Sequence, residues 1–135
     1  MKEITSDILA SANAHSERLR ELIISPETLV MPGAYDGLSA RVFGAMGFKA
    51  IQCASGGIAA GLGYKDGEVV TLEQTLHLSQ IIAEAVTVPV NGDGERGYGN
   101  AAEVGDTVRG YILAGCAGMN IEDSNPHFPG EPITL

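Results

Sequence analysis

The sequence predicts an α/β fold in which helices cover a parallel sheet. Short apolar runs alternate along the chain with longer segments whose apolar residues recur at helical spacing. The short runs are apolar on both faces, which is typical of strands buried between two layers. Polar residues gather directly after each run. This alternation is characteristic of successive β/α units.

The first predicted element is a helix over residues 6–22, with Ser6 as a candidate N-cap. A short apolar run at 29–31 predicts the first strand, which ends at a Pro-Gly turn. A second helix is expected over 35–48, with Gly47 as its C-terminal stop.

The same pattern then repeats along the rest of the chain. We expect strands over 49–54, 88–93 and 117–123, helices over 71–86 and 101–115, and a glycine-rich loop over 55–68. The carboxyl ends of parallel strands lie on one face, so the polar residues that follow them should converge there. These residues are Tyr35, Asp36, Ser55, Gly56, Gly57, Asp93, Glu95, Glu122 and Asp123.

Length and composition limit the classes of protein that need to be considered. A chain of 135 residues with 44% hydrophobic and 19% charged residues is long enough for one globular domain. A net charge of −9 without a basic cluster argues against nucleic acid as a partner. With neither a membrane-length apolar run nor a signal-peptide pattern, we expect a cytoplasmic protein with no membrane partner. Cys53 and Cys116 are expected to be reduced and buried.

Four carboxylates are predicted to face one small volume at the strand ends. Asp93 and Glu95 lie side by side, Glu122 follows the last strand, and Asp66 lies in the glycine-rich loop. Like charges held close repel, and a divalent cation is the usual compensation. Mg²⁺ takes one or two protein carboxylates directly and keeps several waters, so Asp93 is the expected direct ligand. The alternative is that these residues are solvated loop carboxylates or helix caps.

Two further features lie near this volume. Glycines after Ser55 let backbone N–H groups approach an anion, such as the carboxylate or phosphonate of a substrate, although a flexible turn would look the same. His127 is the only histidine near the predicted site, and an ordinary loop histidine is the competing interpretation.

Four segments together resemble the isocitrate lyase/phosphoenolpyruvate mutase superfamily. They read MPGAYDGLSARVFGAMGF, SGGIAAGLGYKDGE, PVNGDGERGYGN and GCAGMNIEDS, in the order and spacing of that superfamily from about 29 to 123. The resemblance implies a (β/α)₈ TIM-barrel fold, of which this chain holds the first β/α units through strand 4. Residues 1–26 would form an N-terminal helical segment and 27–135 the half barrel.

The resemblance also implies an activity and a set of site residues. Members use Mg²⁺, with Mn²⁺ as a substitute, to stabilise the enolate of a small 2-oxo acid during C–C or C–P bond cleavage. Their substrates include dicarboxylates and phosphonates. Carried over by position, the metal residues are Asp93, Glu95 and Glu122; the catalytic residues are Asp66 and Glu122; and the substrate-binding residues are Tyr35, Ser55, Gly56 and Gly57. The spacing from Ser55 to Asp66 is one or two residues shorter than the common pattern.

Two departures from the superfamily leave alternatives open. The region after the fourth strand, SNPHFPGEPITL, lacks the Lys and Cys of the lyase lid, and a complete barrel needs about 250 residues. The chain is therefore interpreted as the N-terminal half of a lyase or mutase, or as a non-catalytic half barrel used for binding or assembly. Two copies could also form one barrel-like homo-oligomer. A third interpretation, a Mg²⁺-dependent pyruvate aldolase on the same fold, would use Arg96 as its basic group.

Overall fold

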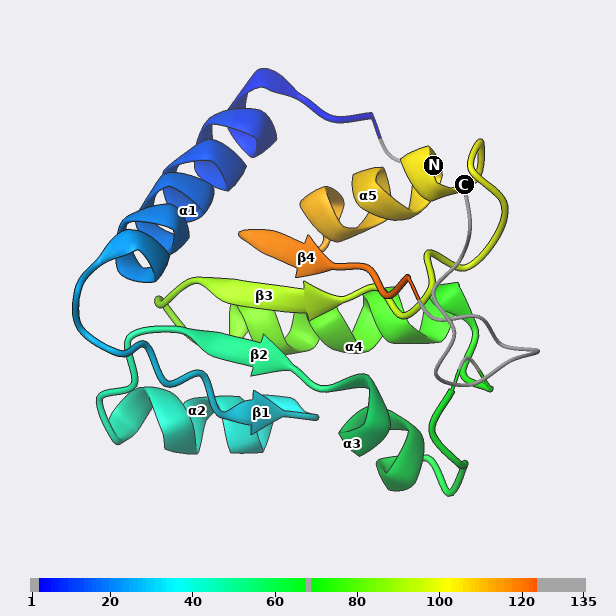
Figure 1. Ribbon diagram of the computed structural model, residues 1–135, viewed down its shortest axis with the longest axis horizontal. Helices are drawn as coiled ribbons and strands as arrows, with labels where there is room; N and C mark the ends of the chain where they lie inside the picture. The colour runs from blue at the N-terminus through cyan, green and yellow to red at the C-terminus, as the bar shows by residue number, and fades with distance from the viewer. Residues whose placement is uncertain (1–2, 68, 124–135) are drawn as a thin grey trace.

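The computed structural model describes residues 3–67 and 69–123, and this part of the chain contains one four-stranded parallel sheet (Figure 1). The strands are β1 (Gly33–Ala34), β2 (Ile51–Cys53), β3 (Val90–Asp93) and β4 (Gly118–Asn120). They lie side by side in chain order. When each new parallel strand is added at the same edge of the sheet, the helical connections all lie on the same side of it, as in the first half of a (β/α)₈ barrel. The predicted fold class is confirmed.

The described helices are α1 (Ser6–Ile24), α2 (Gly37–Ala45), α3 (Ser55–Gly61), α4 (Leu72–Glu84) and α5 (Val104–Leu113). Local sequence explains where several of them begin. Capping boxes start α2 at Asp36 and α4 at Thr71, while the N-cap of α1 is Thr5 rather than the predicted Ser6. Gly47 adopts a φ of +85° just beyond α2, which confirms it as the C-terminal stop.

The main hydrophobic core lies between the sheet and the helices α2, α4 and α5. Ile51, Val90 and Ile82 are almost completely buried in it, and Tyr111 is one of its largest fully buried side chains. Such burial stabilises the fold by roughly 1.5–3 kcal/mol for each large aliphatic side chain. Both cysteines are free and buried, as predicted.

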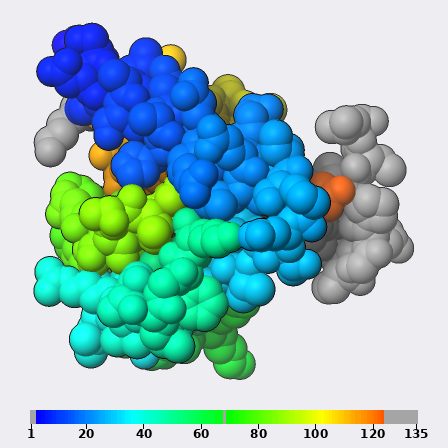
Figure 2. All heavy atoms as spheres, turned by 90° about the vertical axis from the view of Figure 1, so that its left-hand side faces the viewer, coloured from blue at the N-terminus to red at the C-terminus, as the bar shows by residue number. Residues whose placement is uncertain are grey.

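A second, smaller cluster fixes α1 to the end of the sheet where the strands begin. Leu19 and Leu22 of α1 pack there with Ala50 and Ala117, the residues that precede β2 and β4. Figure 1 shows α1 at that end, and Figure 2, which looks at the molecule from that end, shows the α1 atoms over the upper part of the face. The helix thus packs against the amino ends of β2 and β4, and the carboxyl ends of the strands point away from it.

The structure corrects three details of the sequence-based picture. The first strand is Gly33–Ala34 rather than 29–31, where Leu29 and Met31 instead pack against the small cluster beside α1. The segment predicted as a glycine-rich loop begins with helix α3, because Ile58 and Ala59 turn into the main core. The strands are also not apolar on both faces, since the face away from the helices carries polar side chains.

Among the described residues, no helix combines the length and apolar character needed to cross a membrane.

Candidate functional site

Asp93, at the carboxyl end of β3, has its side chain held from both sides by neighbouring elements. The Ser55 hydroxyl, at the start of α3, donates a 2.7 Å hydrogen bond to Asp93 Oδ2. Asn120 Nδ2, at the end of β4, donates to Asp93 Oδ1 over 3.2 Å, and the backbone N–H of Glu95 reaches the same oxygen over 3.3 Å. The ends of β2, β3 and β4 therefore meet at this carboxylate.

Glu95 is a carboxylate that the fold buries beside other carboxylates. Its exposed fraction is 5%, and its φ of 47° places it in the left-handed region, which a residue with a side chain rarely adopts. Burial raises the pKa of Glu95; a hydrogen bond with Ser55 lowers it, and the charges of Asp93, Asp66 and Glu122 raise it further. A strained, buried acid among like charges is characteristic of a functional site.

The structure brings all four predicted carboxylates into one neighbourhood. The backbone N–H of Glu122 donates a 2.6 Å hydrogen bond to the carbonyl of Glu95, and Asp66 lies against Gly56 at the start of α3. The charges of Asp93, Asp66 and Glu122 are close enough to Glu95 to raise its pKa. Within 3–67 and 69–123, however, no three His, Cys, Asp or Glu side chains are grouped tightly enough to hold a metal ion. The metal assignment stays a prediction.

The loop that carries Glu95 is fixed to the helix layer. Gly97 N–H donates to the Gly94 carbonyl over 2.8 Å, which closes a tight turn, and the buried Thr107 hydroxyl on α5 donates to the Gly97 carbonyl over 2.8 Å. The hydroxyls of Tyr98 and Thr75 lie 3.1 Å apart, which ties the loop to α4 as well. Hydrogen bonds to two helices therefore fix the loop that carries Glu95.

The residues predicted to bind substrate also lie at this end of the sheet. A Cβ placed on Gly57 would lie 3.0 Å from the Cβ of Tyr35, and one on Gly56 would lie 3.1 Å from the carboxyl carbon of Asp66. Both glycines thus allow a close approach that a side chain would prevent. Tyr35, 47% exposed, lies against α3 at Gly57.

Sequence reasoning missed three amide side chains on the face of the sheet below Asp93. Gln52, Asn91 and Asn120 lie on β2, β3 and β4 and hydrogen-bond to one another. A signal was present, because each is a polar residue within a short apolar run. His127, the other candidate near the site, lies outside the described residues.

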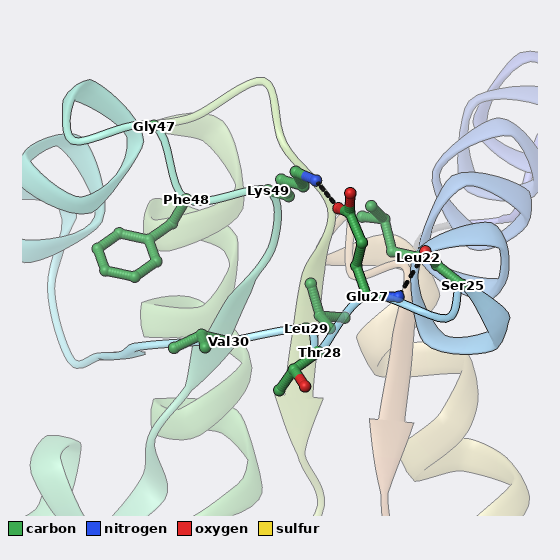
Figure 3. Close-up of a pocket in the computed structure, with 9 residues that line it drawn as sticks. All are labelled: Leu22, Ser25, Glu27, Thr28, Leu29, Val30, Gly47, Phe48 and Lys49. Atoms are coloured by element: carbon green, nitrogen blue, oxygen red, sulfur yellow. Dashed lines mark hydrogen bonds and ion pairs between the residues drawn. The ribbon is translucent and has the colours of Figure 1, made fainter.

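A separate hollow lies at the opposite end of the sheet (Figure 3). It is lined by Leu22, Leu29 and Phe48 among others, and Lys49 Nζ forms a 2.7 Å ion pair with Glu27 Oε2 at its edge. None of the predicted site residues lines it. This hollow is therefore separate from the carboxylates at the strand ends.

Comparison with known proteins identifies the family. The family model of phosphoenolpyruvate phosphomutase matches residues 19–134, which is most of the chain. The chain belongs to the phosphoenolpyruvate phosphomutase family. The resemblance inferred from the four sequence motifs is confirmed.

Individual members of the family show the same similarity. The chain is 38% identical over 107 residues to 2,3-dimethylmalate lyase of Eubacterium barkeri, which covers 78% of this chain and 37% of that protein. It is 36% identical over 105 residues to 2-methylisocitrate lyase of Aeropyrum pernix, covering 78% and 34%. The crystal structure of phosphoenolpyruvate phosphomutase from Streptomyces platensis subsp. rosaceus superposes with a TM-score of 0.78 at 36% identity, covering 87% and 42%.

The chain therefore spans about two fifths of the length of the relatives it matches. Those relatives are lyases and a mutase, which supports the predicted lyase or mutase class. The matched part includes every residue of the candidate site.

Proposed function

We propose that this chain provides the metal-binding and substrate-binding half of a Mg²⁺-dependent lyase or mutase. The substrate class is a small 2-oxo acid or its adduct, either a dicarboxylate or a phosphonate, and the bond cleaved is C–C or C–P. The observation that carries the proposal is the convergence of Asp66, Asp93, Glu95 and Glu122 at the carboxyl ends of the strands.

The donor chemistry of these residues fits Mg²⁺. All four side chains offer carboxylate oxygens, the ligands that Mg²⁺ prefers, and Mn²⁺ accepts the same set. Asp93 would bind the ion directly, while Glu95 and Glu122 would hold its coordinated waters. A site with one direct carboxylate does not require three acidic side chains to meet at one point. Bound there, the ion would stabilise the negative charge of an enolate oxygen.

The remaining residues have roles in binding and orientation. Ser55 holds Asp93 Oδ2 through its hydroxyl, which fixes one side of the carboxylate. The backbone N–H groups of Gly56 and Gly57, in the first turn of α3, would receive the carboxylate of the 2-oxo acid. Tyr35 would line the substrate site on the side of α3. Fixing both ends of a small acid in this way orients the bond that breaks.

The proposal is tested by titrating Mg²⁺ into the 135-residue chain in a calorimeter. Asp93→Ala should weaken Mg²⁺ binding by about 100-fold or more, because it removes the direct ligand, while the circular dichroism spectrum stays that of the folded protein. Asp106→Ala is the matched control, since it removes an exposed carboxylate on α5 that pairs with Arg109. Unchanged affinity in Asp93→Ala would refute the metal assignment.

A non-catalytic half barrel that serves assembly is the alternative function. It is favoured by the two edge strands of the described sheet, β1 and β4, since unpaired edges invite pairing with another chain. Light scattering with and without Mg²⁺ separates the two proposals. A particle of about twice the 14.0 kDa chain mass that turns over no 2-oxo acid would favour assembly.

A further inference from the structure

The three amides below Asp93 form a closed hydrogen-bond network across three strands. Asn91 Nδ2 donates to Gln52 Oε1 over 2.9 Å, and both Asn91 Nδ2 and Gln52 Nε2 donate to Asn120 Oδ1, over 3.2 and 3.1 Å. The strand register brings them together, because Gln52 pairs with Asn91 and Asp93 pairs with Asn120. All three side chains therefore lie on the same face of the sheet as Asp93.

The network permits only one orientation of the Asn120 amide. Two N–H donors, from Gln52 and Asn91, point at its oxygen, so its NH₂ group must face Asp93. The reverse orientation would set its oxygen against the carboxylate and its NH₂ group against two other donors. Both contacts would then be repulsive, and the hydrogen bonds would be lost.

We infer that Asn120 is a positioning residue that fixes Asp93 for the metal, with Gln52 and Asn91 holding Asn120 in its working orientation. This inference rests on the proposed function. Asn120 restrains Oδ1 of Asp93 from β4, and Ser55 restrains Oδ2 from the start of α3. Restrained at both oxygens, the carboxylate cannot rotate about its terminal torsion without losing a hydrogen bond. Such restraint of a metal ligand by its hydrogen-bond partners typically changes metal affinity by about 10–100-fold.

The side chain of Asn120 is exposed, which separates this role from a purely structural one. Substitution of an exposed side chain usually changes the free energy of unfolding by less than about 0.5 kcal/mol. We therefore expect the loss of Asn120 to appear in metal affinity and not in the thermal unfolding midpoint. A residue with only a structural role would show the opposite.

The test is calorimetric titration of Mg²⁺ into Asn120→Leu, which keeps similar bulk and removes the amide. Affinity should fall by about 10-fold or more, with the unfolding midpoint within about 2 °C of the wild type. Gln52→Leu should weaken Mg²⁺ binding by a smaller factor, because Asn91 still donates to the Asn120 oxygen. This second variant tests the inference if Asn120→Leu does not fold. Gln80→Leu, an exposed amide on α4 bonded to Glu84, is the control and should bind normally.

The outcomes distinguish this inference from the proposed function. If Asp93→Ala abolishes binding while Asn120→Leu keeps wild-type affinity, the positioning role is wrong and the metal site stands. If Asn120→Leu changes only the KM for a 2-oxo acid, Asn120 contacts substrate and the positioning role is again wrong. If neither Asp93→Ala nor Asn120→Leu affects binding, both proposals fail.

Discussion

Replacing Gly92 by alanine tests the packing that supports the candidate site from the helix side. Gly92 lies on β3 directly before Asp93, and a Cβ there would come 2.5 Å from Cδ1 and 2.6 Å from Cε1 of Tyr111. Real Cβ atoms essentially never approach another atom so closely. The Tyr111 ring must therefore move, and its hydroxyl donates to the backbone carbonyl of Asp93.

The expected cost follows from these two consequences. Forcing an extra methyl group into a well-packed core costs about 1–3 kcal/mol. Losing the hydrogen bond to the Asp93 carbonyl adds about 1–2 kcal/mol. Together Gly92→Ala should lower the free energy of unfolding by about 2–5 kcal/mol. For a chain of this length that corresponds to a drop of about 7–18 °C in the thermal unfolding midpoint.

The matched control makes the same substitution where there is room. Gly105, in the first turn of α5, is exposed, and a Cβ there would meet no atom within 4 Å. Gly105→Ala should leave stability unchanged or raise it by up to about 1 kcal/mol, because alanine favours helix. Thermal unfolding is followed by far-ultraviolet circular dichroism. A midpoint for Gly92→Ala within about 2 °C of the wild type would refute the described packing of Tyr111 on β3.

Three further predictions concern the thiols, a helix cap and the metal. Burial raises the pKa of Cys53 to about 11 and that of Cys116 to about 12, so neither thiol should react with a thiol reagent at neutral pH until the protein unfolds. Because the folded state holds these protons more tightly than the unfolded state, the free energy of unfolding should fall as the pH rises from about 9 through 11. The same pH dependence of the unfolding midpoint in a variant with both cysteines replaced by serine would contradict this. Thr71→Ala removes the N-cap of α4 and should cost about 1 kcal/mol in chemical denaturation, whereas an equal midpoint for wild type and variant would show that the cap is not needed. Any turnover of a 2-oxo acid should stop in excess chelator and return with Mg²⁺, and full activity in chelator would count against the enolate mechanism.

The order of strands and helices could be predicted from the sequence because each segment has its own periodicity. The limits of the prediction lie where tertiary packing overrides local pattern. The run at 29–31 is apolar enough for a strand, yet it packs against the cluster beside α1, and pairing with β2 begins only at Gly33. The glycines after Ser55 suggest a loop, but the buried Ile58 and Ala59 convert the segment into α3.

The convergence of the carboxylates was predictable from the sequence, whereas the convergence of the amides was not. Asp93 and Glu122 follow apolar strands, so the rule that parallel strands end on one face was enough to bring them together. Gln52 and Asn120 lie inside strands that were interpreted as apolar on both faces. Which face of a strand turns away from the helices depends on register, and register is set by contacts between segments far apart in the sequence. The network they form is visible only in three dimensions.

Convergence of the carboxylates depends on the backbone as much as on the side chains. Pairing between β3 and β4 continues past the strand ends, since Gly94 N–H donates to the Asn120 carbonyl over 2.9 Å and Glu122 N–H donates to the Glu95 carbonyl. The close approach at Gly94 is available only to glycine, because a Cβ there would lie 2.8 Å from the Asn120 carbonyl oxygen. The backbone thereby holds the segments that carry Asp93, Glu95 and Glu122 together against the repulsion of their charges. A cation bound among them would reduce that repulsion and stabilise the folded state by linkage. The structural feature that brings the acids together is therefore also the one that would favour a metal at this end of the sheet.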